Sequence, residues 1–350
     1  MMRIRPPLSL WRVPPWPEHA SARGPVILLY HSVAKVGSDP WGLRVSPRNF
    51  AEQMAVLRTH TKPIHLNHLD RALSGGEMPP RSVAVTFDDG FADNLHQAKP
   101  VLERHAIPAT IFVATGYVGS QREYWWDELD RLLLAPGRLP ERIALQSGET
   151  QCQWDLGAAS NYSRLQAWRD RRWKAWHEHD PTARHTAYRA AWQLLRQSTT
   201  AAREKALEEL RQIASVTSAG RVNRRCVSID ELHELARGDL IEIGAHTVTH
   251  PSLGAIRLHD QRSEIMESKT WLERTLNRPI MSFSYPFGTR EDYTTGTIEL
   301  LRQAGFERSC SNFPGVISRE VDRYQLPRRV VLDWDGREFI SKLKTWFAEQ

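Results

Sequence analysis

The chain has 350 residues, enough for one large domain or two ordinary ones with a sizeable buried core. Apolar residues make up 41% of the sequence and charged residues 25%, which excludes a disordered chain and a fibrous repeat. Lys and Arg number 47 and Asp and Glu 41, a formal net charge of +6. This excess is mild, and acidic residues spread along the whole chain argue against a dedicated nucleic-acid binder.

The N-terminal region differs in composition from the rest. Residues 1–24 hold five prolines and one short apolar run, so we expect a flexible N-terminal arm. That run is too short for the apolar part of a signal peptide, and no stretch of the chain approaches 18 apolar residues. We therefore expect a cytoplasmic protein that is at most peripheral at the inner membrane. The three cysteines form no CxxC pair, so neither a disulfide framework nor a thiolate zinc site is predicted.

Buried-strand patterns alternate with helix signals on both sides of the middle of the chain. Short continuous apolar runs predict strands that are buried on both faces, as in a parallel sheet or barrel. These strands are expected at residues 26–30, 82–87, 107–115, 240–244, 281–285 and 306–310. Ser46, followed by Pro47, and Ser228 predict the starts of two of the helices. About seven strands alternating with helices predict an α/β fold, and we favour a closed or nearly closed barrel over residues 25–350.

The middle of the chain, at about residues 121–225, interrupts this alternation with helical sequence rich in tryptophan. It holds seven of the thirteen tryptophans. This predicts a helical insertion that buries these rings, with a sugar groove lined by some of them as the alternative. Residues 161–225 carry 14 Lys and Arg against 6 Asp and Glu. A solvated helical face explains that excess, and contact with an anionic membrane surface or a lipid-linked substrate is the alternative.

Two motifs with metal-binding side chains follow predicted strands. Asp88 and Asp89 come directly after one strand, at the edge where barrel enzymes keep their active sites. Because neighbouring carboxylates repel each other, we expect a cation beside at least one of them. His246 and His250 follow another strand, and a helical turn there would place both imidazoles on one side. Two histidines and one carboxylate are a known catalytic ligand set for zinc.

The order of the motifs resembles the polysaccharide deacetylase family of metal-dependent carbohydrate esterases. The motifs are TFDDG at residues 86–90, HTVTH at 246–250 and SYPFG at 284–288. The resemblance covers about residues 26–329 outside the insertion. It is strongest for the branch that removes N-acetyl groups from poly-N-acetylglucosamine. It implies a distorted (β/α)7 barrel, a divalent metal ion, Zn²⁺ in particular, and a glycan or amino-sugar substrate.

The resemblance also implies a role for each motif residue. Asp89, His246 and His250 would hold the metal ion, and Asp88 would be the general base that deprotonates the attacking water. The backbone N–H of Phe287 would help to stabilise the oxyanion.

The sequence departs from the family pattern at two places. Ser284 stands where the third motif usually has an arginine that orients the base, and no histidine follows His259 to serve as the usual general acid. We therefore predict that His31, at the end of the first strand, is the general acid and that Arg328 is the partner of Asp88. The residues grouped as substrate-binding are Tyr285, Phe287 and Arg328.

The leading hypothesis is a metal-dependent hydrolase that removes N-acetyl groups from amino sugars of a polysaccharide or a lipid-linked glycan. One alternative keeps the fold and acts as a deformylase or amidase on a small or non-sugar amide. Another is a catalytically silent glycan-binding module. The intact set of Asp88, Asp89, His246 and His250 argues against the silent module, because a binding protein does not need all four.

Overall fold

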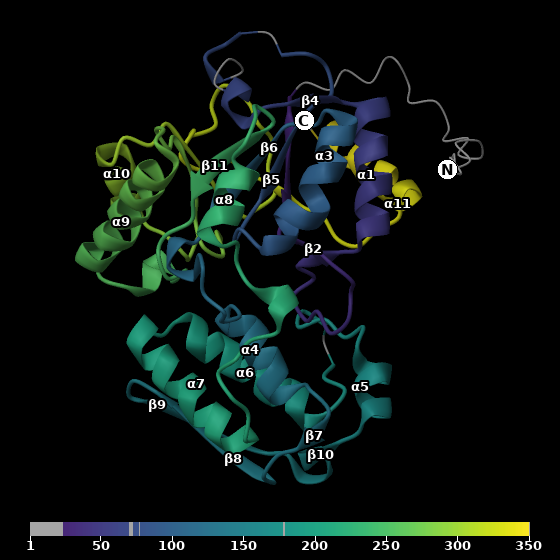
Figure 1. The fold of residues 1–350 in the computed structure, drawn as a ribbon, viewed down its shortest axis with the longest axis vertical. Coiled ribbons are helices and arrows are strands. Elements are labelled where there is room, and N and C mark those ends of the chain that lie inside the picture. Colours follow the sequence, from purple (N-terminus) through teal and green to yellow (C-terminus); the bar gives the residue numbers. More distant parts are fainter. Residues whose placement is uncertain (1–23, 70–72, 77, 178, 350) are drawn as a thin grey trace.

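The structure, a computed structural model, describes residues 24–69, 73–76, 78–177 and 179–349. All but the last residue of the predicted arm, 1–24, lies outside the described residues. Figure 1 shows two lobes. The upper lobe contains the main sheet and its covering helices, and the lower lobe consists of residues 125–214.

The upper lobe is built on an eight-stranded sheet in which every pair of neighbouring strands is parallel. The strand order is β13-β12-β11-β6-β5-β1-β14, and β4 pairs with β5 outside this path. The strands are β1 Val26–Tyr30, β4 Lys62–Ile64, β5 Ser82–Phe87, β6 Ala109–Val113, β11 Ile241–Ala245, β12 Ser282–Ser284, β13 Arg308–Cys310 and β14 Arg329–Val330. Both faces of β1, β5 and β6 are buried, as their continuous apolar runs predict.

The last part of the chain brings the two sides of the sheet together. Leu326 forms a parallel bridge with Cys310 of β13, and Arg329 and Val330 then pair with β1. The chain from Leu326 to Val330 therefore spans the gap between β13 and β1, on opposite sides of the sheet. The predicted fold, a distorted (β/α)7 barrel, is confirmed.

Helices cover the outside of the barrel (Figure 1). They are α1 Pro47–His60, α3 Lys99–His105, α8 Ile229–Leu235, α9 Leu258–Leu276, α10 Thr295–Gln303 and α11 Gly336–Ala348. The predicted cap residues are confirmed, since the Ser46 side chain accepts from Asn49 N and Ser228 forms a capping box with Glu231. A short strand pair, β2 Ser32–Val33 with β3 Arg44–Val45, extends from the barrel toward the lower lobe.

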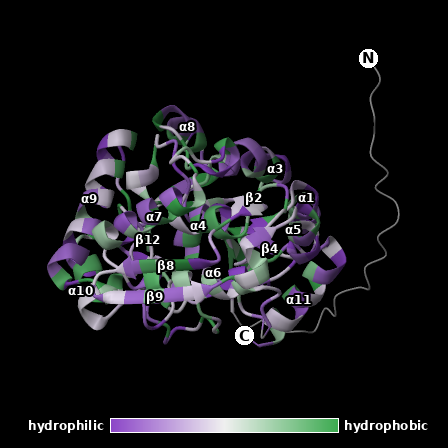
Figure 2. Cartoon of the chain, turned by 90° about the horizontal axis from the view of Figure 1, so that it is seen from below, coloured by the Kyte–Doolittle hydropathy of each residue, from purple (hydrophilic) through white to green (hydrophobic). Residues whose placement is uncertain are grey.

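The lower lobe is less helical than the sequence suggested. Its helices are α4 Trp125–Leu133, α5 Arg164–Asp170, α6 Ala183–Arg196 and α7 Thr200–Ala214, and its strands are β7 Gly137–Arg138, β8 Arg142–Ser147, β9 Thr150–Asp155 and β10 Asn161–Tyr162. In Figure 2 the hairpin of β8 and β9 crosses the face turned to the viewer. Ile143 and Leu145 of β8 alternate with exposed residues and pack toward α7. This two-residue period was the signal for a strand that our helical prediction missed.

Buried ion pairs join the two lobes. Asp127 of α4 pairs with Arg44 of β3 and with Arg224, whose Nη1 lies 2.9 Å from the carboxylate. Arg44 also pairs with Asp39 at 3.2 Å. Removing one member of such a buried set costs about 3–5 kcal/mol, because its partner is left charged and uncompensated. These ion pairs therefore help to hold the lower lobe against the barrel. None of the helices in the described residues is long and apolar enough to cross a membrane.

Candidate metal centre

Most of the predicted site residues lie at the carboxyl ends of the barrel strands. Asp88 and Asp89 follow β5, His246 follows β11, and His31 follows β1. Since the strands are parallel, their carboxyl ends meet at one edge of the sheet, and the lower lobe lies beyond this edge (Figure 1).

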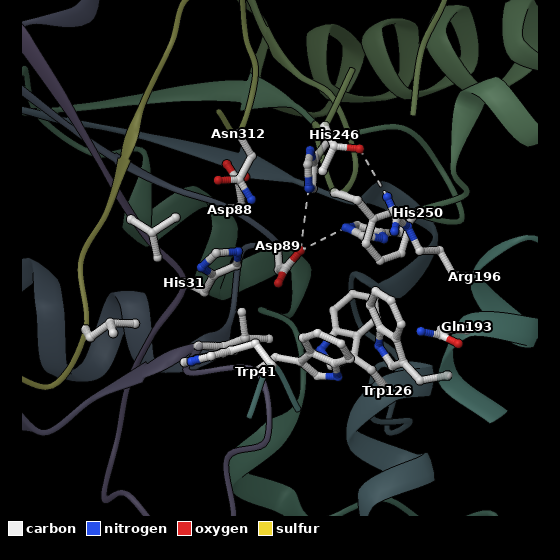
Figure 3. Close-up of a pocket in the computed structure, with 17 residues that line it drawn as sticks. His31, Trp41, Asp88, Asp89, Trp126, Gln193, Arg196, His246, His250 and Asn312 are labelled. Carbon is white, nitrogen blue, oxygen red and sulfur yellow. Dashed lines mark hydrogen bonds and ion pairs between the residues drawn. The ribbon is translucent and has the colours of Figure 1, made fainter. Parts of the chain in front are cut away.

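Asp89, His246 and His250 converge on one point (Figure 3). Their candidate ligand atoms all lie within 4.8 Å of one another, and all three residues are buried. Asp89 Oδ1 is 3.5 Å from His246 Nε2 and 3.3 Å from His250 Nε2. Burial raises the pKa of Asp89, but the two imidazoles outweigh that effect and hold the pKa well below its usual range.

The donor set fits a divalent cation. Within the described residues, neither carboxylate oxygen of Asp89 has a hydrogen-bond partner, although the residue is 1% exposed. A buried carboxylate without hydrogen bonds is costly, and a cation held between it and two imidazoles would reduce that cost. His246 Nδ1 lies 2.7 Å from the carbonyl oxygen of Ser284 and donates to it in the tautomer that leaves Nε2 free. This is the outer contact that metal-binding histidines usually make.

The segment that carries both histidines is not the helical turn that would have placed both imidazoles on one side. Residues 246–250 form a loop in which Thr247 and His250 have φ of 65° and 54°. Glu264 of α9 holds the loop by accepting hydrogen bonds from the backbone N–H groups of Val248 and Thr249, both at 2.8 Å. The imidazoles converge because of this left-handed backbone, not because of helical spacing.

Asp88 is held by Arg328 instead of by the ligand set. Arg328 Nη1 and Nη2 donate to the two carboxylate oxygens of Asp88 at 2.8 and 2.7 Å. Ser284 Oγ accepts from the same guanidinium at 2.9 Å and lies 3.2 Å from Asp88 Oδ2. Burial raises the pKa of Asp88, but the paired guanidinium and the neighbouring imidazoles together outweigh that effect and bring the pKa below its usual value. The carboxylate is therefore ionised at neutral pH. A guanidinium from outside the third motif thus reaches the acid beside Ser284.

A cavity of about 640 Å³ opens beside these groups, between the barrel and the lower lobe. Its wall includes His31, Asp88, Asp89, His246, His250 and Phe287, together with tryptophans of the lower lobe. Burial lowers the pKa of His31, although Asp89 nearby opposes the shift. Figure 3 shows Trp41 and Trp126 across the cavity from Asp89.

Two of the residues grouped as substrate-binding do not reach this cavity. Tyr285 is fully buried, stacks on Tyr293 with ring centroids 3.9 Å apart, and donates from Oη to the carbonyl of Tyr324 at 2.8 Å. Arg328 is also buried, behind Asp88. Of the three residues only Phe287 lines the cavity, so Tyr285 and Arg328 are not placed to contact a molecule bound there.

Other cavity residues were not predicted from the sequence. They are Trp41, Leu43, Trp176, Trp192, Gln193, Arg196, Thr289, Asn312, Val330 and Leu332. Trp41 and Trp192 lie against each other with ring centroids 4.0 Å apart, although 151 positions separate them in the chain. The tryptophan-rich sequence was the only signal for this wall, and it did not show which rings would face the cavity.

A profile of a protein family matches residues 75–137 and 195–309, just over half of the chain. Its description is polysaccharide deacetylase. The chain belongs to the polysaccharide deacetylase family. The unmatched residues between the two segments, 138–194, fall in the lower lobe, which is consistent with a family barrel that carries additional structure.

Individual relatives agree with this family. A putative polysaccharide deacetylase of Bacillus subtilis, YxkH, is 21% identical over 89% of this chain and 74% of its own length. A poly-beta-1,6-N-acetyl-D-glucosamine N-deacetylase of Staphylococcus aureus is 33% identical, over 25% of this chain and 30% of its own length. The structure of the Streptococcus pyogenes deacetylase PplD in complex with acetate covers 92% of this chain and 98% of that one, with a TM-score of 0.52 and 19% identity. That last likeness concerns the fold.

Proposed function

We propose that this protein is a metal-dependent hydrolase that removes N-acetyl groups from the amino sugars of a glycan. The observation that carries the proposal is the cluster of Asp89, His246 and His250 next to a separate, arginine-held carboxylate, Asp88, at one wall of a cavity. Family membership and the named activity of the Staphylococcus aureus relative support the same reaction class.

Each group of the chain has a task in this reaction. Asp89, His246 and His250 would hold a divalent ion, Zn²⁺ in our proposal, and that ion would supply a Lewis acid for the acetamide carbonyl and would lower the pKa of water. Asp88 accepts a proton from the attacking water. The N–H of Phe287 donates to the oxygen that becomes negative, and His31 gives a proton to the departing nitrogen. Arg328 keeps Asp88 ionised and oriented.

The substrate proposal is tested with purified protein loaded with Zn²⁺. N-acetyl and N-formyl amino sugars, free, polymeric and lipid-linked, are incubated with it, and released acetate, formate and free amine are measured. We expect acetate from an N-acetylated glycan. Formate alone, or activity on simple non-sugar amides alone, would favour the deformylase or amidase alternative. Binding of glycans without any release would favour the silent module.

Trp126 is expected to contact the substrate, whereas Trp125 is not. Trp126 lines the cavity and is 5% exposed, while Trp125 is 1% exposed and is not among the residues that line the cavity. Trp126→Ala should raise KM about tenfold with a smaller change in kcat, because a stacked ring contributes about 1.5 kcal/mol to binding. Steady-state kinetics on the glycan measures this. The exposed Trp168 supplies the control, Trp168→Ala, and equal effects of both substitutions would contradict a specific contact by Trp126.

His31 is expected to protonate the leaving nitrogen. His31→Ala should lower kcat on an amide about 10²-fold, the usual contribution of a positioned general acid. An activated ester of the same acyl group needs no such proton, so its hydrolysis should change little. The measurement is the ratio of the two losses.

Metal content and a matched variant control for indirect effects of this substitution. His96 is an exposed histidine paired with Glu231, and His96→Ala should leave both rates unchanged. Equal losses on amide and ester in His31→Ala would show that His31 holds the site in shape and that another group is the acid.

We also propose peripheral contact of the lower lobe with the anionic cytoplasmic face of the inner membrane. Leu165 and Trp168 of α5 are 56% and 60% exposed, and exposed arginines flank them at positions 164, 169 and 172. Tryptophan at the interface and arginines over anionic headgroups, each adding about 1 kcal/mol, favour such contact.

Sedimentation with vesicles tests this contact. The protein should bind phosphatidylglycerol–phosphatidylcholine vesicles in a salt-dependent way and bind pure phosphatidylcholine weakly. The Leu165→Ala, Trp168→Ala double variant should lose this binding. Leu258, exposed on α9, gives the control Leu258→Ala. Binding that survives in the double variant would exclude α5 as the contact surface.

A further inference from the structure

A buried carboxylate, Asp292, joins two of the loops that form the metal centre. It is 0% exposed, and its oxygens accept from Thr289 N at 2.9 Å and Thr289 Oγ1 at 2.6 Å, in the loop that follows β12. It also accepts from Ser252 Oγ at 2.8 Å, two residues beyond His250. Asp292 therefore fixes the loop of Phe287 relative to the loop of the histidine ligands.

The cation on Asp292 comes from the lower lobe. Arg196, the last residue of α6, has its Nη2 2.6 Å from both carboxylate oxygens of Asp292 and 3.3 Å from Thr289 Oγ1. The same guanidinium lies over the ring of Phe287, 5.0 Å from its centroid. Within the described part of the chain, Arg196 is the only cation paired with this carboxylate. Figure 3 shows Arg196 beside His250 at the cavity wall.

Phe287 needs support because its backbone is strained. Its φ is 61° and that of Gly288 is 68°, so two successive residues lie in the left-handed region, which a phenylalanine rarely adopts. Within the described residues, no protein acceptor takes the backbone N–H of Phe287. Its ring centroid lies 4.8 Å from that of His250. Strain of this kind persists at a site only where surrounding contacts enforce it.

We propose that Arg196 is a positioning residue. It acts through Asp292 and the ring of Phe287 to keep the free N–H of Phe287 aimed at the acyl oxygen. The inference rests on the proposed hydrolase function for the purpose of that N–H, but the ordering of the loop can be measured without any substrate. It gives the lower lobe a second task besides lining the cavity, since α6 completes a catalytic loop of the barrel.

Arg196→Gln tests this role through kinetics and local dynamics. Removing one oxyanion donor costs about 10²–10³-fold in kcat, so a misaimed N–H should lower kcat about 10–10²-fold with KM changed less than about threefold. Amide hydrogen exchange of residues 284–292, followed by mass spectrometry on the metal-free protein, should speed up at least about tenfold because the loop opens more often. Exchange in β5 and β6 and the affinity for Zn²⁺ should stay as in the wild type.

Three further variants separate positioning from other roles. Gln193→Ala removes a cavity residue one turn away on α6 and should raise KM without faster exchange of the loop. Arg189 lies on the same helix as Arg196 but outside the cavity, and it pairs with Asp180. Arg189→Gln breaks that pair and should change neither KM nor loop exchange. Arg196→Lys keeps a cation on Asp292 and should restore part of both kcat and loop protection.

The outcomes distinguish this inference from the proposed function. Wild-type protein without activity on any substrate, combined with faster loop exchange in Arg196→Gln, would refute the hydrolase while upholding the role of Arg196 in ordering the loop. Unchanged loop exchange in a folded Arg196→Gln would overturn the inference. A higher KM at wild-type kcat would also overturn it, because Arg196 would then be a substrate contact.

Discussion

Asp88→Asn should abolish most of the hydrolase activity while the metal ion stays bound. An amide cannot accept the proton of the attacking water, so kcat should fall by about 10² or more, the contribution of a general base. Asp88 lies outside the cluster of candidate ligands, so Zn²⁺ content, measured by inductively coupled plasma mass spectrometry, should equal that of the wild type. Retention of most of the activity would show that Asp88 is not the base.

Loss of the ion pair with Arg328 is a competing explanation that has to be separated from loss of the base. Arg328 is 1% exposed, and an uncompensated buried guanidinium would destabilise the fold by about 3–5 kcal/mol. Thermal unfolding therefore accompanies the kinetics, and Ser284→Ala serves as the matched control. That variant removes a hydroxyl that contacts both members of the pair, but it leaves the carboxylate in place.

Chemical rescue sharpens the same test. In Asp88→Gly the missing carboxylate leaves space next to the arginine, and added formate can occupy it. We expect formate to restore part of kcat in Asp88→Gly and to leave the wild type unchanged. Absence of rescue in a folded variant that still binds metal would place the proton acceptor elsewhere.

The barrel could be predicted from the sequence because most of its strands have a recognisable pattern within their own residues. Continuous aliphatic runs are buried on both faces, and the predicted strand at residues 82–87 has the same bounds as β5. The hairpin of β8 and β9 was missed although Ile143 and Leu145 alternate with exposed residues, because tryptophans at helical spacing dominated the interpretation of that region. Short strands such as β4 and β14 carry too few residues for any period to stand out.

The side chains of the site also fall into two groups, those that could be placed from the sequence and those that could not. Asp88, Asp89 and His246 follow strands directly, so strand prediction was enough to bring them together. Arg196 and Asp292 meet only because the lower lobe folds back over the barrel, and no local pattern encodes that contact.

The direction of the Tyr285 side chain follows from extended-chain geometry once the position of Ser284 is known. Successive side chains in an extended segment point to opposite sides, and Ser284 at the strand end faces Asp88. The next residue must therefore point away from the acid, as Tyr285 does by reaching the carbonyl of Tyr324.

The His246→Ala, His250→Ala double variant should lose the metal ion and, with it, all measurable activity. Loss of outer partners of ligating histidines alone costs about 10–100-fold in metal affinity, so loss of two ligands should cost far more. Competition with a chromophoric chelator and metal analysis measure the affinity and the stoichiometry. The expected change is from one Zn²⁺ per chain to less than about a tenth of one.

The chain offers a matched control for removing two histidines at once. His65 and His68 also lie near each other, with ring centroids 5.4 Å apart, but outside the cavity. The His65→Ala, His68→Ala double variant should therefore keep both metal and activity. Full Zn²⁺ occupancy in the His246→Ala, His250→Ala protein would refute the metal centre. Metal loss in the control as well would point to nonspecific binding by histidines. If the metal centre is refuted, Asp89 is a buried carboxylate that is compensated by the two imidazoles alone, and no ion is needed to account for its ionised state.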